Sequence, residues 1–217
     1  IPVAESQAGK GSLPWDHPLN LGGIGVTGSP AANQAAHEAD LVFAIGTRLQ
    51  DFTTGSHSLF AHLPLLSLNV QAVDAAKRHG TPLVADARTG LQQLNEVLAG
   101  WQTEPSWSAH SRNLAADWAT RVTELTTAVT PKDQLPYDAE VIGAVRDSTT
   151  DSPTSDIVVC AAGTLPAELH KLWRAGEPGS YHVEYGYSTM GYEIAGGLGV
   201  KLARPDKEVI VMVGDGS

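Results

Sequence analysis

The residues best suited to chemistry stand at the end of the sequence, in the turn Gly214-Asp215-Gly216-Ser217. Residues 209–213 before this turn are all apolar and mostly β-branched, which is typical of a strand buried on both faces of a parallel sheet. Open α/β sheets bind ligands at the carboxyl ends of their strands. Glycines there let backbone N–H groups approach an anion, and a carboxylate beside a phosphate can hold a divalent cation. Taken alone, the same four residues also suit an ordinary Asp-Gly turn.

A glycine-rich helix is predicted before that strand. Its apolar stripe has i, i+4 spacing and consists of Met190, Ile194, Leu198 and Leu202. Its glycines are Gly191, Gly196, Gly197 and Gly199. Each glycine lowers helix stability by about 1 kcal/mol against alanine, so we expect another backbone to lie close to this helix. Ser188 or Thr189 can cap its start. Arg204 and Pro205 suit its end.

Composition and charge exclude several classes of protein. The net charge of −10 at pH 7 argues against nucleic acid binding. It does not argue against a phosphate cofactor, because Mg²⁺ and backbone amides neutralise a diphosphate locally. The sequence has no apolar run near the roughly 20 residues of a membrane span, and its His and Cys residues lack zinc spacing. The single cysteine, Cys160, lies in an apolar run and is predicted to be a buried core thiol rather than a nucleophile.

The pattern of apolar runs divides the chain into three parts, at residues 1–100, 101–155 and 156–217. In the first part, strands are predicted at 2–4, 41–45, 65–70 and 82–85, and helices at 30–39, 73–78 and 90–98. This alternation predicts an α/β fold with one parallel sheet covered by helices on both faces. The second part is predicted to be a linker with helices at 107–128 and 139–146. The third part should begin with a strand at 156–161 and a helix through 174.

Two loops in these parts contain candidate polar residues. The glycine-rich run GGIGVTG at 22–28 could cradle a nucleotide phosphate, but it lacks GxGxxG spacing after a strand, so a turn-rich loop is favoured. Glu184 stands at the end of a predicted strand and can act on substrate hydroxyls or on a proton. An equal alternative is that Glu184 is a solvated or salt-bridged loop residue. His182 is a weaker candidate for lining a substrate pocket.

The glycine-rich helix, the strand and the GDG turn together resemble the cofactor-binding domain of thiamine diphosphate enzymes. In that family the acid that Asp215 matches binds Mg²⁺, and two turns contact the diphosphate. The matching residues here are Gly163, Thr164, Leu165, Gly214, Gly216 and Ser217. Met190 stands 25 positions before Asp215, where the family has the hydrophobic residue that supports the bent cofactor. We therefore expect its side chain to be substantially buried near the turn in the assembled site. Ser188 replaces a glycine whose carbonyl usually contacts the aminopyrimidine.

Longer motifs narrow this resemblance. ADLVFAIGTR at 39–48 is similar to a pattern in the middle domain of these enzymes. It implies a Rossmann-like, parallel-sheet middle domain at 1–100, followed by the first part of a thiamine diphosphate-binding α/β domain at 156–217. Three runs resemble the subfamily that hydrolyses trihydroxycyclohexane-1,2-dione: QAGKGSLPWDHPLNLGGIGVTG, TRLQDFTTGS and YHVEYGYSTMGYE.

The resemblance implies a function. It implies thiamine diphosphate- and Mg²⁺-dependent hydrolytic C–C cleavage that opens the ring of this dione to 5-deoxy-glucuronate in inositol degradation. The enzyme is expected in the cytoplasm, without a nucleic acid or membrane partner, as a homodimer or dimer of dimers whose subunits share the active site. Two alternatives stay open: an acetolactate synthase-like carboligase or decarboxylase, and a non-catalytic nucleotide-binding subunit of the same fold.

The two ends of the chain suggest an internal segment of a longer protein. The sequence starts at Ile1 and stops inside the GDG motif. In the family, the glutamate that activates the cofactor and the asparagine that completes the metal site would lie outside these residues. The segment alone is therefore expected to bind Mg²⁺–thiamine diphosphate poorly and to be inactive.

Overall fold

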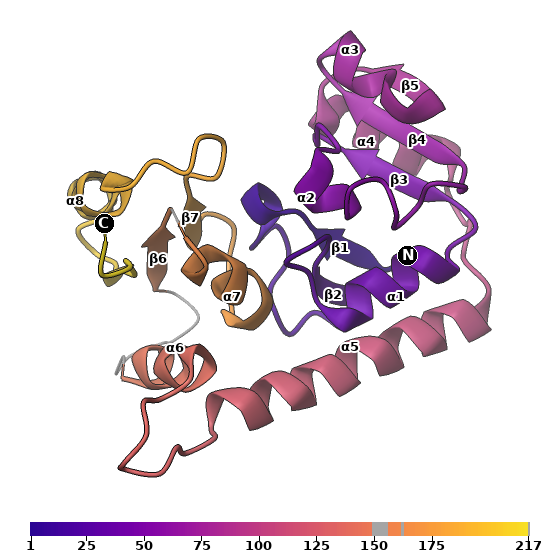
Figure 1. The fold of residues 1–217 in the computed structure, drawn as a ribbon. Coiled ribbons are helices and arrows are strands. Elements are labelled where there is room, and N and C mark those ends of the chain that lie inside the picture. Colours follow the sequence, from indigo (N-terminus) through magenta and orange to yellow (C-terminus); the bar gives the residue numbers. More distant parts are fainter. Residues whose placement is uncertain (149–155, 162, 217) are drawn as a thin grey trace.

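The computed structural model describes residues 1–148, 156–161 and 163–216, and it has the predicted α/β fold (Figure 1). In this described part, all strands pair in parallel, in one two-stranded sheet and two three-stranded sheets. The long helix α5 (Pro105–Thr126) runs beneath the amino-terminal elements and ends near the carboxyl-terminal ones (Figure 1).

Residues 1–100 form two sheets, so the prediction of a single sheet is wrong. The first pairs β1 (Val3–Glu5) with β2 (Asn20–Gly23). The second has the order β3 (Val42–Ile45), β4 (Leu65–Asn69) and β5 (Thr81–Val84). The sequence pattern missed β2 because its four residues, NLGG, are half glycine, which disfavours a strand. Because β1 takes β2 as its partner, it belongs to a separate sheet.

The helices of this region follow the strands as the alternation predicts. They are α1 (Pro30–Glu38), α2 (Asp51–Thr54), α3 (Ala72–Ala75) and α4 (Ala87–Val97). Ser29 caps α1, since its Oγ accepts a hydrogen bond from the Ala32 N–H at 3.0 Å, and Pro30 suits the first helical position. The single helix predicted at 73–78 is wrong, because Arg78 takes a φ of 64° in a separate 3₁₀ turn after α3.

The linker contains the two predicted helices, α5 and α6 (Asp138–Asp147). They pack closely: a Cβ added at Gly143 would lie only 2.0 Å from the Thr126 carbonyl oxygen. The last linker residues, 149–155, fall outside the described part. Within the described ranges, no helix combines the length and apolar character that crossing a bilayer requires.

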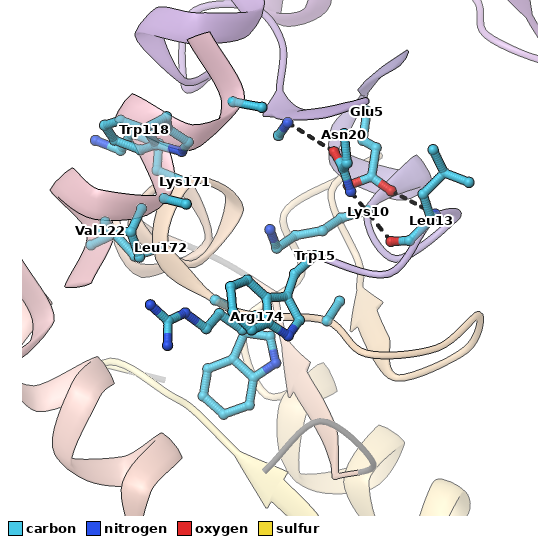
Figure 2. A pocket seen from close by; sticks show the side chains of 15 residues that line it. Glu5, Lys10, Leu13, Trp15, Asn20, Trp118, Val122, Lys171, Leu172 and Arg174 are labelled. Atoms are coloured by element: carbon cyan, nitrogen blue, oxygen red, sulfur yellow. Dashed lines mark hydrogen bonds between the residues drawn. The ribbon is translucent and has the colours of Figure 1, made fainter. Parts of the chain in front are cut away.

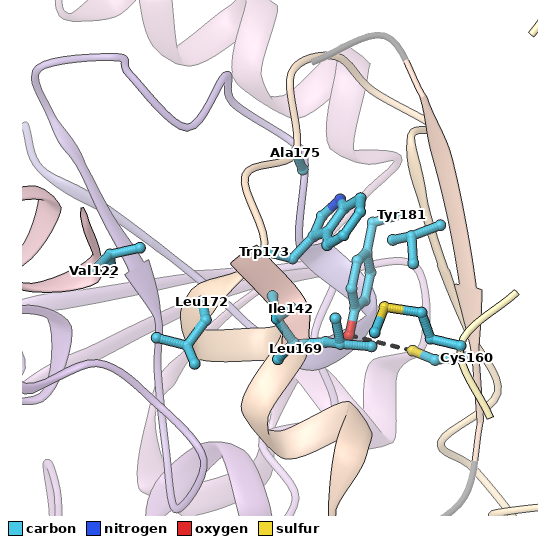
Figure 3. Close-up of a cluster of buried hydrophobic side chains, with 10 residues drawn as sticks. Val122, Ile142, Cys160, Leu169, Leu172, Trp173, Ala175 and Tyr181 are labelled. Atoms are coloured by element: carbon cyan, nitrogen blue, oxygen red, sulfur yellow. Dashed lines mark hydrogen bonds between the residues drawn. The ribbon is translucent and has the colours of Figure 1, made fainter. Parts of the chain in front are cut away.

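The carboxyl-terminal elements surround the main hydrophobic core. They are β6 (Ile157–Cys160), α7 (Leu165–Leu172), β7 (Tyr181–Val183), α8 (Tyr192–Ala203) and β8 (Val209–Val211), and the sheet order is β7-β6-β8. The core also includes Val122 of α5 and Ile142 of α6, so the linker helices contribute to it, and α6 contacts α7 (Figure 3). Cys160 is fully buried, which confirms the prediction of a core thiol, and this burial raises the pKa of the thiol to about 11.

The burial predicted for β8 on both faces is not observed within the described residues. β8 pairs in parallel with β6, as expected, but it lies at the edge of the described sheet and its residues are half-buried. α8 packs against it through a face that includes the buried residues Glu193 and Gly197. The apolar stripe faces elsewhere and is exposed: Met190 65%, Ile194 62%, Leu198 62% and Leu202 75%. The burial of Met190 in an assembled site stays a prediction.

The predicted cap of α8 is also wrong at its start. The helix begins at Tyr192, and Gly191 is its cap residue with a φ of 88°, a left-handed conformation that favours glycine. Ser188 and Thr189 therefore lie in the loop before the helix. The predicted end is confirmed, because Arg204 is the carboxyl-terminal cap residue and its N–H donates to the Val200 carbonyl.

Two glycines of α8 are expected to respond oppositely to replacement by alanine. A Cβ at Gly199 would meet nothing within 4 Å, so Gly199→Ala should raise the free energy of unfolding by up to about 1 kcal/mol through helix propensity. A Cβ at Gly197 would lie 2.3 Å from Val211 Cγ2 in β8, so Gly197→Ala should lower the free energy of unfolding. Thermal unfolding of the two variants measures the difference. Equal stabilisation by both would contradict the packing of α8 on β8.

Candidate functional site

Three loops begin at one edge of the carboxyl-terminal sheet. The central strand β6 pairs in parallel with β7 on one side and β8 on the other. The backbone register continues past β8, where the Met212 N–H donates to the Val159 carbonyl at 3.0 Å. Because parallel strands end at the same edge, the segments 163–165, 184–190 and 213–216 all start there. This is the edge at which open α/β sheets bind ligands.

The turn after β8 is open to solvent. Gly214, Asp215 and Gly216 are exposed, and a Cβ added at either glycine would meet nothing within 4 Å. A ligand can therefore approach the backbone of this turn, with the Asp215 carboxylate beside it. Ser217, the last residue predicted to contact the diphosphate, lies outside the described residues.

The turn after β6 provides a second open backbone segment. Gly163 takes a φ of 86°, which favours glycine, and a Cβ there would also meet nothing within 4 Å. Thr164 is exposed and precedes α7, which starts at Leu165 with Pro166 in its first turn. The amides of Ala167 and Glu168 already donate to the Thr164 carbonyl. An anion at this edge would therefore meet the backbone of the turn 163–165 itself.

Glu184 holds the loop after β7. Its Oε2 accepts a hydrogen bond from the Thr189 N–H at 2.6 Å, and its Oε1 accepts one from the Tyr187 N–H at 2.9 Å. These two bonds hold the pKa of the Glu184 carboxyl below its usual value, and the bond from Thr189 has the larger effect. Glu184 is therefore ionised at neutral pH and fixes a loop that contains Ser188 at a φ of 50°. Contact of Glu184 with a substrate stays a prediction.

A second carboxylate in this region was not predicted from the sequence. Glu193 in the first turn of α8 is buried, and its Oε2 accepts a hydrogen bond from the Gly191 N–H at 2.9 Å. It thereby fixes the start of the helix directly after Met190. An acidic residue in the first turn of a mostly apolar helix was the available signal.

The amino-terminal region contacts the Glu184 loop through two aromatic rings. Phe52 of α2 and Tyr185 pack edge to face, with their ring centroids 5.4 Å apart. Phe52 is itself held from the other side, because its carbonyl accepts a hydrogen bond from the Val26 N–H at 2.8 Å. A Cβ at Gly25 would overlap the same carbonyl oxygen, so the backbones of these two segments touch.

Most backbone amides of the glycine-rich run 22–28 are engaged within the protein. The Gly22 N–H donates to Asn20 Oδ1 at 2.8 Å, and the Gly25 N–H donates to Asn33 Oδ1 at 3.0 Å. The Gly28 N–H donates to the Gly25 carbonyl at 2.9 Å. These amides are not directed at an external anion, so the geometry favours the turn-rich loop over a nucleotide phosphate cradle.

Comparison with known proteins assigns both halves of the chain to one family. Residues 1–94 match the thiamine pyrophosphate enzyme central domain, and residues 161–217 match the thiamine pyrophosphate enzyme C-terminal TPP binding domain. The chain belongs to the thiamine pyrophosphate enzymes. Thiamine pyrophosphate is thiamine diphosphate, so the predicted cofactor is confirmed for this family member. The second match contains both open turns, the Glu184 loop and α8.

Several curated relatives of this thiamine pyrophosphate enzyme are named 3D-(3,5/4)-trihydroxycyclohexane-1,2-dione hydrolase. The protein from Geobacillus thermodenitrificans is 42% identical over 240 residues, which cover 100% of this chain and 36% of the relative. Those from Bacillus subtilis and Clostridium perfringens are 38% and 40% identical, and the match covers 100% of this chain and 37% of each relative. The chain thus spans a little over a third of the length of these relatives.

The described residues of this thiamine pyrophosphate enzyme fit one side of a cofactor site. Two open glycine turns at one sheet edge can approach a diphosphate, and Asp215 can supply an oxygen ligand to a metal ion. Among the residues that the structure describes, no group of three or more His, Cys, Asp or Glu side chains gathers to hold a metal. Phosphate oxygens and other ligands would have to complete the coordination of a cation at Asp215.

Proposed function

We propose that this chain is part of a hydrolase that uses thiamine diphosphate and Mg²⁺ to open the ring of trihydroxycyclohexane-1,2-dione. The product would be 5-deoxy-glucuronate, formed in inositol degradation. The observation that carries the proposal is the match of the whole chain, at 38–42% identity, to relatives named for hydrolysis of this dione. The two open turns at the carboxyl edge of the β7-β6-β8 sheet support the cofactor part of the proposal.

The chain's own residues would bind and orient the cofactor. In the proposal, two turns bind the diphosphate: Gly163, Thr164 and Leu165 after β6, and Gly214, Gly216 and Ser217 after β8. Asp215 would bind Mg²⁺, since a carboxylate oxygen is the ligand that this ion prefers. Bound thiamine diphosphate supplies a carbanion and an electron sink for C–C cleavage. Met190 and the Ser188 carbonyl would support its ring system.

The Glu184 carboxylate is expected to act mainly by holding its loop. A glutamine can still accept one of the two amide hydrogen bonds, so Glu184→Gln should keep turnover of the full-length enzyme within about 10-fold of wild type. Glu184→Ala removes both acceptors and should lower turnover further. Steady-state kinetics of the two variants distinguishes a carboxylate that holds the loop from one that transfers a proton. If Glu184→Gln lowered turnover about 100-fold or more, and as much as Glu184→Ala, the carboxylate would be acting on a proton instead.

We also propose that the protein is a homodimer or a dimer of dimers with a shared active site. The exposed stripe of Met190, Ile194, Leu198 and Leu202 begins at the cofactor edge and suits an interface with a second subunit. The variant Leu198→Lys should shift the full-length protein toward monomer in light scattering, whereas Lys201→Ala on the same helix should not. An unchanged mass for Leu198→Lys would remove this stripe from the interface.

The proposed activity is tested on the full-length protein with the cyclic dione as substrate. We expect the dione to be consumed, and an open-chain acid to form, only when thiamine diphosphate and Mg²⁺ are both present. Pyruvate in parallel assays should not be consumed. Turnover of pyruvate without turnover of the dione would identify a carboligase or decarboxylase. Failure to bind thiamine diphosphate would identify a non-catalytic subunit.

A further inference from the structure

Helix α7, which begins at the turn 163–165, is held at both ends by the amino-terminal region. At its start, Gln7 Nε2 donates a hydrogen bond to the Pro166 carbonyl at 3.2 Å. Near its end, Lys10 Nζ donates to the His170 carbonyl at 3.0 Å, and His170 Nε2 lies 2.9 Å from the Glu5 carbonyl. The helix has eight residues and is about 12 Å long, so these contacts fix both its position and its direction.

The hydrogen bonds of His170 have only one consistent direction. The Glu5 carbonyl can only accept, so Nε2 of His170 must carry a hydrogen and donate to it. Burial is the main cause that lowers the pKa of His170 to about 4, and the nearby Lys10 charge is the second cause. The ring is therefore neutral at pH 7. Its Nδ1 is then an acceptor, and the Thr27 hydroxyl donates to it at 3.1 Å. Gln7 Nε2 donates in turn to Thr27 Oγ1 at 3.2 Å.

The packing around His170 leaves little freedom for another arrangement. The His170 side chain is 1% exposed, and a Cβ added at Gly23 would lie 2.5–2.8 Å from three atoms of its ring. The imidazole therefore lies directly on the backbone of β2. Gln7 and Lys10 are also buried. A displacement of α7 would break several buried hydrogen bonds together, and each buried polar group left unsatisfied is unfavourable.

Lys10 places a charge at the carboxyl end of α7. Figure 2 shows its side chain extending from the segment that also carries Glu5 into the pocket beside Leu172. The His170 carbonyl belongs to the last turn of α7, where helix carbonyls lack intrahelical partners and a cation interacts favourably with the helix dipole. Burial nevertheless lowers the pKa of Lys10 to about 8, so its charged form is disfavoured there. A buried charge of this kind is better suited to fixing one position of α7 than to raising the free energy of unfolding.

We propose that Gln7, Lys10 and His170 are positioning residues, which set the place of α7 and thereby hold the turn 163–165 against the diphosphate of the cofactor. This inference rests on the proposed function, in which that turn binds the diphosphate. Gln7 contacts Pro166, the residue directly after the turn, so its hydrogen bond acts within one residue of the proposed ligand contact. A helix shift as small as 1 Å at a positioned group is enough to weaken binding or catalysis.

The inference is tested by titrating the full-length protein with thiamine diphosphate in excess Mg²⁺ and following binding by calorimetry. Gln7→Met removes the donor at nearly constant volume and should raise the Kd for the cofactor about 10-fold. The kcat at saturating cofactor should stay within about 2-fold of wild type, because Gln7 does not touch the reacting atoms. The matched control, Gln93→Met on the exposed surface of α4, should leave the Kd unchanged.

A milder variant keeps the test valid if Gln7→Met folds poorly. Thr27→Val removes the hydroxyl that donates to His170 and preserves the side-chain shape, and it should raise the Kd about 3-fold. If both variants lower the melting temperature of the cofactor-free protein and leave the Kd unchanged, the contacts are merely structural and the inference is overturned. If the wild-type protein does not bind thiamine diphosphate, the proposed function itself fails.

Discussion

Replacing Asp215 by alanine in the full-length protein is expected to reduce Mg²⁺-dependent binding of thiamine diphosphate by about 100-fold or more. Mg²⁺ requires nearly octahedral oxygen coordination, and Asp215 is the carboxylate in the open turn after β8. In the part of the chain that the structure describes, no metal-binding cluster of three or more side chains could replace it. Calorimetric titration with the cofactor, with and without Mg²⁺, measures the effect.

The control for this substitution is Asp206→Ala. Asp206 is also exposed and lies just before β8, but its carboxylate pairs with Arg204 at 3.1 Å, outside the glycine turns. Its removal should leave cofactor binding unchanged, because an exposed ion pair contributes little to stability. Tight Mg²⁺-dependent binding by Asp215→Ala would place the metal site elsewhere in the protein.

The second large effect expected is a loss of stability in mild acid, caused by His170. Its pKa is about 4 in the folded protein against 6.5 in an unfolded chain, because burial disfavours the charged ring. Between these two pH values the unfolded state binds more protons, so the free energy of unfolding falls as the pH falls. The contribution is complete above pH 6.5 and is lost toward pH 4, and it amounts to about 3 kcal/mol.

Thermal unfolding of the full-length protein between pH 7.5 and pH 4.5 measures this acid sensitivity. Lys10 faces His170, and because burial lowers its pKa to about 8 it is partly neutral at pH 7.5 and becomes fully charged as the pH falls. The Glu5 carboxylate lies near Lys10. The comparison is made with His170→Gln, whose amide nitrogen can replace the donor to the Glu5 carbonyl but does not titrate. This variant should show a flatter pH dependence. Equal slopes for the two proteins would show that His170 does not carry the effect.

Sequence patterns predicted those features that depend on local composition. The runs around Val42–Ile45 and Leu65–Asn69 are apolar and bounded by turns, so they indicated strands of a parallel sheet. The glycine turns at 163 and 214–216 were identified as strand-end turns because each follows such a run. β2 was missed because NLGG has little strand propensity, and its place is set by pairing with β1 instead.

Features that depend on distant partners could not be predicted in the same way. His170 contacts Glu5 and Thr27, which are 165 and 143 positions away in the sequence, and nothing in its immediate surroundings indicates that pairing. The exposure of Leu198 and Leu202 was missed for a related reason. Helical periodicity shows that a face is apolar, but it does not show which neighbour covers that face.

In the proposed function, the cofactor's diphosphate lies against the turns after β6 and β8. Hydrogen–deuterium exchange of the full-length protein, with and without Mg²⁺–thiamine diphosphate, tests it most directly because it reports on individual backbone segments. We expect the cofactor to slow exchange in peptides containing 163–165 and 214–216 and to leave peptides of the run 22–28 unchanged. Slower exchange confined to 22–28, or no change at either turn, would contradict it.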